Sequence, residues 1–99
     1  MNYRVRYTLE VKEDLKRLFT FLTEQDPQAA KHARKTIAAS IELLQQFPFT
    51  CRKAVPENAL LRELVIPFGS TGYVALFEID DKETVTIVAV RHQREDDYH

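Results

Sequence analysis

Cysteine, glycine and serine are scarce in this 99-residue chain, and their scarcity excludes several kinds of site. The lone Cys51 cannot form an intramolecular disulfide, and no pair of cysteines has the spacing of a zinc site. Gly69 and Gly72 are the only glycines and fall in one expected hairpin loop, so the chain has no glycine-rich phosphate-binding loop. Gly-x-Ser-x-Gly and His-Glu-x-x-His motifs are also missing. We therefore expect no metal and no cofactor.

The chain also lacks a strong charge of either sign and any long apolar run. Its net charge is −1, so a basic site for a polyanion would have to be local. A content of 44% hydrophobic and 29% charged residues is that of an ordinary globular chain. No stretch reads as a leader peptide or is long enough to span a bilayer. We expect a single domain over residues 1–99, located in the cytoplasm and without a membrane partner.

The first quarter of the chain predicts a short strand and a helix. Aromatic or apolar residues alternate with basic ones at its start: Tyr3, Arg4, Val5, Arg6 and Tyr7. Such alternation is typical of a half-buried strand, and the arginines suit an edge position. Thr8 can cap a helix that ends near Glu24, with an ion pair between Glu13 and Arg17 on its exposed side. The apolar face of this helix has residues at helical spacing: Val11, Leu15, Leu18, Phe19 and Leu22.

A second helix is predicted from Asp26-Pro27 to about Gln46. Aspartate as the N-cap and proline at the first helical position together are a strong start signal. Because the link between the helices is so short, they should form an antiparallel hairpin. Residues 50–59 are expected to form a loop. The second helix has its own apolar face: Ala30, Ala33, Ile37, Ile41 and Leu44.

Three strands are predicted in the last part of the chain, over residues 60–66, 72–80 and 84–91. Turn residues separate them, which is the pattern of an antiparallel meander. The third strand is apolar on both faces, so it should lie in the middle of the sheet. A helical hairpin across one face of the sheet would bury every apolar face. The predicted fold is a two-layer α+β domain with the element order β-α-α-β-β-β.

Basic residues at the end of the third strand are the main candidate site. Arg62, in the first meander strand, is the other cationic candidate, although the spacing does not place it beside the strand end. Guanidinium groups could hold a phosphate or stabilise a phosphorane, with a histidine or tyrosine as proton donor. We favour the simpler interpretation of a charged strand end whose arginines pair with acidic tail residues. The residues concerned are the basic Arg91, His92 and Arg94, the donors His92, Tyr98 and His99, and the acidic Glu95, Asp96 and Asp97.

Two further candidates have simpler interpretations. If residues 92–99 were helical, His92, Asp96 and His99 would share a face and offer metal ligands. His99 is the last residue, where chains fray, so we favour a solvated tail. Cys51 could be a nucleophile only with a base beside it, and a free, unreactive thiol is the expected state. His32 is expected to be an exposed helix residue.

Five short motifs follow one another along nearly the whole chain: Asp26-Pro27-Gln28-Ala29-Ala30, Leu43-Leu44 through Phe47-Pro48, Leu61-Arg62-Glu63-Leu64, Gly72-Tyr73-Val74-Ala75-Leu76-Phe77 and Val88-Ala89-Val90-Arg91-His92-Gln93-Arg94. In this order and spacing they resemble the RelE/ParE superfamily of small toxins from toxin–antitoxin modules. The fold of that superfamily agrees with the strand, hairpin and meander predicted above from periodicity.

The resemblance favours the ParE-like branch. RelE-like members cleave mRNA on the ribosome, using lysines and arginines of the meander with a C-terminal tyrosine or histidine. In this chain the first two meander strands contain no lysine, and Val74 stands where the RelE-like branch tends to carry an arginine. Cleaving a phosphodiester needs several charges focused on it. The alternative nuclease set that remains is Arg62, Arg91, Arg94, Tyr98 and His99.

ParE-like members poison DNA gyrase without being enzymes. The resemblance therefore implies a toxin of a type II toxin–antitoxin system, with growth arrest and plasmid stabilisation as associated roles. Its partners would be DNA gyrase or a related topoisomerase, bound through Arg91, His92 and Arg94, and a cognate antitoxin laid over the hairpin and a sheet edge. Two alternatives stay open: a RelE-like mRNA endoribonuclease with the ribosome and mRNA as partners, and a member that only binds its antitoxin. Because toxin and antitoxin are typically opposite in charge, the expected antitoxin contacts are Arg4, Arg6, Lys31, Arg34 and Lys35.

Overall fold

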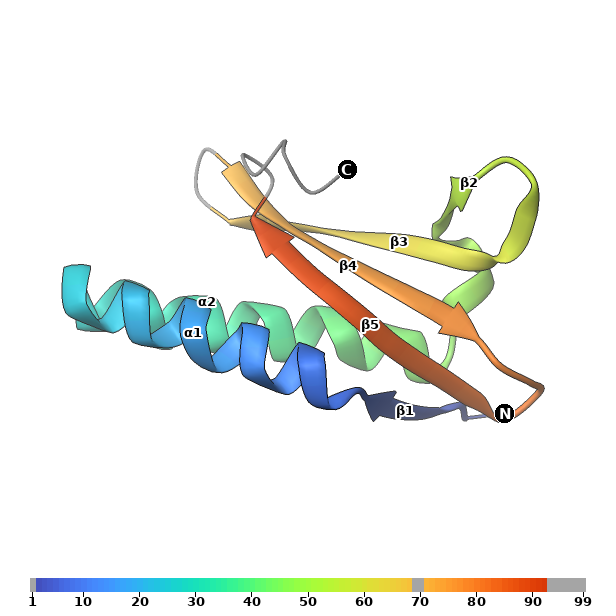
Figure 1. The fold of residues 1–99 in the computed structure, drawn as a ribbon, viewed down its shortest axis with the longest axis horizontal. Coiled ribbons are helices and arrows are strands. Elements are labelled where there is room, and N and C mark those ends of the chain that lie inside the picture. The colour runs from blue at the N-terminus through green and yellow to red at the C-terminus, as the bar shows by residue number, and fades with distance from the viewer. Residues whose placement is uncertain (1, 69–70, 93–99) are drawn as a thin grey trace.

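A sheet and a helical hairpin form two layers in the computed structural model, which describes residues 2–68 and 71–92 (Figure 1). In chain order the elements are β1 (Arg4–Tyr7), α1 (Leu9–Gln25), α2 (Pro27–Glu42), the 3-10 turns η1 (Leu43–Gln45) and η2 (Pro48–Thr50), β2 (Arg52–Val55), β3 (Asn58–Phe68), β4 (Thr71–Ile79) and β5 (Thr84–His92). The strands lie in the order β1-β5-β4-β3-β2, and both helices cover one face of the sheet. The predicted α+β fold is confirmed.

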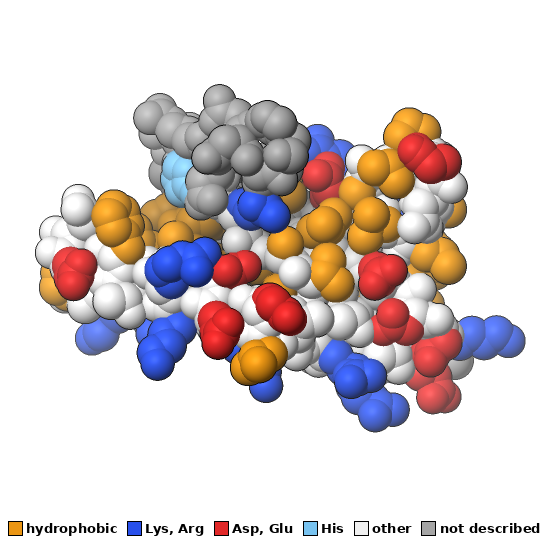
Figure 2. Space-filling view, in the orientation of Figure 1, with side chains coloured by type: hydrophobic (Ala, Val, Ile, Leu, Met, Phe, Trp, Pro, Cys, Tyr) orange, Lys and Arg blue, Asp and Glu red, His pale blue; other side chains and the backbone are white. Residues whose placement is uncertain are grey.

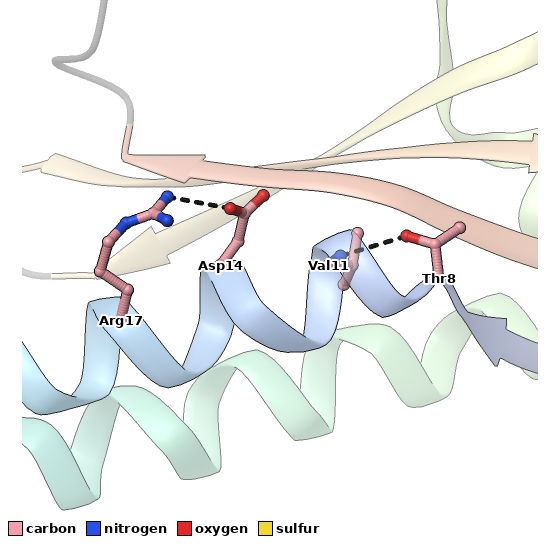
Figure 3. A network of polar contacts seen from close by, with 4 residues as sticks. All are labelled: Thr8, Val11, Asp14 and Arg17. Carbon is pink, nitrogen blue, oxygen red and sulfur yellow. Dashed lines mark hydrogen bonds and ion pairs between the residues drawn. The ribbon is translucent and has the colours of Figure 1, made fainter.

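Side-chain caps fix where both helices begin. The Thr8 hydroxyl accepts a hydrogen bond from the Val11 N–H at 3.1 Å, as Figure 3 shows. The Asp26 carboxylate accepts from the N–H groups of Gln28 and Ala29, and Pro27 occupies the first position of α2. Each cap satisfies donors that a helix start would otherwise leave unpaired. Both predicted starts are confirmed, while α2 ends at Glu42 and continues only as the 3-10 turn η1.

The core lies between the hairpin and the three long strands. The predicted apolar face of α2 is buried throughout, whereas on α1 only Val11 is buried and the rest of the face is partly covered. Fully burying a large apolar side chain contributes about 1.5–3 kcal/mol, so these contacts hold the layers together. The largest fully buried side chains include Tyr73, Phe77, Ile66 and Ile87.

The meander is antiparallel as predicted, and β1 adds a parallel strand at its edge. Val5 is level with Val85 in the parallel pair, which confirms the edge position predicted for the first strand. β5, which was predicted to lie in the middle of the sheet, is an interior strand between β1 and β4, whereas β4 is the central strand of the five. A bulge interrupts β5, because Leu76 pairs with Ala89 whereas Phe77 pairs with Ile87. The residue between them is left without a partner on β4.

Two sequence predictions were wrong in detail. Residues 50–59 were predicted as a loop, but they contain β2, which pairs with the first part of β3. Arg17 was predicted to pair with Glu13, but its Nη2 lies 2.9 Å from Asp14 Oδ1 (Figure 3). Arg17 pairs with Asp14, three residues before it, and both side chains point from α1 toward β5. In the described part of the chain, no helix combines the length and the apolar character needed to cross a membrane.

Candidate functional site

A groove lies between α1 and the end of β5, at the place where the sequence predicts target-binding residues. The strand β1 pairs with β5 only as far as Ile87, and beyond that point α1 packs against β5. The groove that results has a volume of about 400 Å³. It is lined by Asp14, Arg17, Leu18 and Phe21 from α1 and by Val90, Arg91 and His92 from β5.

The α1 side of this groove combines an ion pair with an exposed aromatic ring. The Arg17 side chain is 77% exposed, so its pair with Asp14 contributes little to stability and can be exchanged for another carboxylate. Phe21 is 57% exposed, although burying a phenyl ring is strongly favourable. Arginine beside an aromatic ring is the composition of many protein-binding hot spots. The arrangement is suited to recognition of a protein surface.

Arg17 and Phe21 are members of the site that were not predicted from the sequence. The only signal for them was Phe21, an aromatic residue that does not belong to the apolar face of its helix. An apolar side chain on the exposed side of a helix often marks a contact surface. Nothing in the sequence places that helix beside the end of β5.

A row of rings supports the β5 side of the groove. The His92 ring meets the Tyr73 ring edge-to-face at a centroid distance of 5.4 Å. Tyr73 in turn contacts Phe68 at 5.8 Å, and Phe68 meets the exposed His32 of α2 at 5.2 Å. Tyr73 is only 1% exposed, and this burial raises the pKa of its hydroxyl above the usual value. The end of β5 is therefore held by the contact of His92 with the buried Tyr73 ring.

Arg62 is bound to the protein's own backbone. Its Nε donates to the Ala59 carbonyl at 2.6 Å, and its Nη1 donates to the carbonyls of Cys51 at 2.7 Å and Phe49 at 3.3 Å. The guanidinium also lies 5.3 Å from the centre of the Phe49 ring. It therefore ties η2 and the start of β2 to β3, and its donors are directed at these carbonyls.

Arg62 and Arg91 lie on opposite faces of the sheet. Side chains alternate along a strand, and Arg62 shares its face of β3 with the buried Leu64 and Ile66. Arg91 is level with Val74 and, through it, with Val65 on the other face. The spacing in the sequence did not place these two arginines together, and in the structure they do not meet. Arg94, Tyr98 and His99 of the alternative nuclease set lie outside the described residues, as does Arg94 of the target-binding set.

Cys51 is partly buried, and the positive charge of Arg62 acts on its thiol. Burial raises the pKa of its thiol, and the charge of Arg62 lowers it by a smaller amount. The net increase keeps the thiol protonated at neutral pH, and the thiolate is the reactive form. The contacts around Cys51 therefore fit a structural thiol.

The basic residues predicted to contact an antitoxin fall in three places. Arg4 and Arg6 lie on the edge strand β1. Lys31 and Lys35 line an open depression on one flank of α2, whereas Arg34 faces α1 and lies 4.9 Å from the centre of the Phe19 ring. Figure 2 shows basic and acidic side chains interspersed along the helical layer and hydrophobic ones over the strands.

The metal ligands that the sequence of the tail offered lie mostly outside the described residues. Within residues 2–68 and 71–92, no three His, Cys, Asp or Glu side chains are grouped so that they could hold a metal ion. Of the three residues considered from the sequence, only His92 lies within this range, because Asp96 and His99 lie outside the described residues.

Comparison with known proteins identifies the family. A family model described as the ParE toxin of type II toxin–antitoxin system, parDE, matches residues 5–97. Toxin RelE1 of Caulobacter vibrioides is 32% identical over 79 residues, which are 80% of this chain and 82% of that protein. A chain of the chromosomal ParDE TA system from P. aeruginosa has the same fold, with a TM-score of 0.73, 18% identity, and coverage of 91% of this chain and 95% of its own. The chain belongs to the ParE toxin family of type II toxin–antitoxin systems, within the RelE/ParE superfamily.

Proposed function

We propose that this toxin acts by binding a protein target, DNA gyrase or a related type II topoisomerase, and that a cognate antitoxin neutralises it. The observation that carries the proposal is the position of Arg62. It is the only basic residue of β3 and β4, and it donates to three backbone carbonyls of its own chain. A guanidinium held in this way supports the fold and directs its Nε and Nη1 donors at the chain itself, away from a phosphodiester.

Electrostatics argues against nuclease chemistry on this sheet. Stabilising the charge of a phosphorane requires several donors directed at one point. Among the described residues of the meander strands, Arg62, Arg91 and His92 are the basic ones, and Arg62 lies on the opposite face from Arg91. The described part of the sheet thus does not focus charge on one point, and this supports action by contact with a protein, the mode proposed here.

The target surface that we propose is the groove between α1 and β5. Arg91 and His92 form one wall, and Arg17 and Phe21 of α1 form the other. Arg94 follows Arg91 and His92 in the sequence and belongs to the same proposed contact. The exposed Arg17, the half-buried Arg91 and the Phe21 ring can supply both charge selectivity and burial energy to a protein interface.

The proposed antitoxin contacts are the basic residues of β1 and α2. Arg4 and Arg6 border one edge of the sheet, and Lys31, Arg34 and Lys35 are the only charged residues of α2 before Glu42. An antitoxin of opposite charge would be attracted to both places.

Supercoiling of plasmid DNA by purified gyrase tests the proposal. The wild-type chain is expected to inhibit it, and Arg91→Ala and Arg17→Ala should each weaken inhibition at least about tenfold, as for hot-spot arginines. Lys12→Ala removes an exposed positive charge from α1 outside the groove and should have no effect. An absence of inhibition at a large molar excess of toxin would remove the gyrase assignment.

A RelE-like endoribonuclease is the second candidate, and the Caulobacter relative named Toxin RelE1 favours keeping it. A translation extract would show mRNA cleavage at codon positions, lost in Arg94→Ala or Tyr98→Phe. In the third case, a member that only binds its antitoxin, overexpression of the free chain would leave cell growth unchanged.

A further inference from the structure

Arg17 and Phe21 form a ridge on α1 between two open depressions. Both line the groove described above, whose other wall is β5. Both also line a second depression, of about 630 Å³, together with exposed residues of the same helix: Glu13, Lys16, Thr20 and Glu24. Residues four apart lie next to each other on a helix, so the two side chains leave neighbouring positions of its surface. A partner can therefore reach this ridge from either side.

The Arg17 guanidinium uses only part of its hydrogen-bonding capacity in the free chain. Its Nη2 donates to Asp14 Oδ1 at 2.9 Å, as Figure 3 shows. Within residues 2–68 and 71–92, Arg17 forms no other hydrogen bond or ion pair through its side chain. A guanidinium carries five N–H donors and binds a carboxylate most strongly through two parallel bonds. The pair with Asp14 thus leaves most of these donors for a second acceptor.

Asp14 is the less exposed partner of this ion pair. Its side chain is 31% exposed, against 77% for Arg17, and it lines the groove between α1 and β5. An exposed pair at three-residue spacing is weak, because water screens it. The contact therefore holds the arginine beside the groove and can yield to a better acceptor.

The surroundings of Arg17 specify the chemistry of that acceptor. The groove contains two arginines, Arg17 and Arg91, against one aspartate, so an anion is favoured over a cation. A carboxylate on a protein segment, with an apolar side chain next to it, would match both the charge and the apolar lining. The apolar residues of the lining are Leu18, Phe21 and Val90.

We propose that Arg17 anchors a carboxylate side chain of the protein target, and that Asp14 occupies this place in the free toxin until the target displaces it. An apolar side chain next to that carboxylate would cover the Phe21 ring. The inference rests on the proposed function. It names the group on the target that the groove recognises and the group on the toxin that competes with it.

A phosphate of a nucleic acid is the other anion that an arginine binds well. Two observations favour the carboxylate. Binding along a phosphate backbone takes several cations, whereas this groove has two arginines, one of which is paired with an aspartate. The chain as a whole has a net charge of −1, which gives no long-range attraction to a polyanion.

Removing Asp14 tests the competition. Asp14→Ala deletes the internal carboxylate and should tighten binding of the labelled toxin to purified gyrase about threefold or more, because Arg17 no longer has to be released. Glu13→Ala is the matched control, because it removes the same charge one residue earlier. Glu13 does not pair with Arg17 and does not line the groove. The affinity of this control should stay within about twofold of the wild-type value.

The same change in an Arg17→Ala chain tests whether Asp14 acts through the arginine. Without the guanidinium, Asp14→Ala should have little effect on gyrase binding, and the difference between the two backgrounds measures the coupling. Weakened or unchanged binding by Asp14→Ala alone would overturn the proposal, as would an equal gain with and without Arg17. All free variants should melt close to the wild type, because an exposed ion pair contributes little to stability.

The outcomes separate this inference from the proposed function. If the wild-type chain does not bind gyrase, the proposed function fails and the inference fails with it. If the wild type binds but Asp14→Ala gains nothing, the inference alone fails.

Fluorescent duplex DNA and single-stranded RNA oligonucleotides test for the other anion. Neither should bind in a way that depends on Arg17. Oligonucleotide binding that is lost in Arg17→Ala would overturn the assignment of the anchor to a carboxylate.

Discussion

Replacing Arg62 by alanine tests whether this arginine holds the fold or acts on a target. The change removes three hydrogen bonds to carbonyls, at 2.6, 2.7 and 3.3 Å, and the contact with the Phe49 ring. A partly exposed charged donor contributes about 1 kcal/mol per good bond, and an exposed cation–π contact about 0.5 kcal/mol. The loss should be about 2–4 kcal/mol, which corresponds to roughly 10–25 °C in melting temperature for a chain of this size.

Urea denaturation and thermal melting measure this loss, and neighbouring arginines provide controls. Arg52→Ala breaks only the pair with Glu63, whose arginine is 63% exposed, and should cost less than about 1 kcal/mol. Arg62→Lys should fall in between, because an ammonium group cannot reach the three carbonyls with a planar fork. The reasoning would be refuted if Arg62→Ala melted like the wild type yet lost its toxic action, since Arg62 would then contact the target or an RNA.

Three further changes probe the fold. Gly72→Ala should destabilise the chain by about 1–3 kcal/mol in urea, because its Cβ would lie 2.3 Å from the Ile66 carbonyl oxygen; unchanged stability would contradict that contact. Asp26→Ala removes the side-chain cap of α2 and should cost about 1 kcal/mol, whereas Asp26→Asn should cost much less. Cys51 should react with iodoacetamide at neutral pH more slowly than a free cysteine, because burial raises its pKa, and it should react fully in denaturant. Equal rates with and without denaturant would refute this.

The helices and the meander could be predicted because their signals are local. Asp26-Pro27 combines two start signals, and the apolar face of α2 is regular at helical spacing. The β2 strand could not be predicted in the same way. Its residues, Arg52–Val55, neither alternate nor form an apolar run. They are extended because they pair with β3, and the Arg62 side chain holds the Cys51 carbonyl directly before them.

Only half of the candidate site could be predicted from the sequence, again because the other half depends on contacts between residues distant in sequence. Arg91 and His92 were noticeable because an apolar run ends at them. Arg17 and Phe21 belong to the groove only because α1 packs against β5, which is a tertiary contact. The role of Arg62 was likewise hidden, since the carbonyls that it binds belong to η2, to Cys51 directly before β2 and to the start of β3. Residues that act through distant partners carry no local signature.

The bulge in β5 determines which side chains this toxin can show to a partner. With the extra residue at Val88, Val90 turns into the core and Arg91 is level with Val74 on the uncovered side. Without the bulge, strict alternation from Ile87 through Val88 would turn Val90 outward and place the Arg91 guanidinium against the helices. Deleting Val88 would remove the bulge and leave Arg91 on the uncovered side, so the bulge is what lets a strand with this extra residue keep its basic end at the surface.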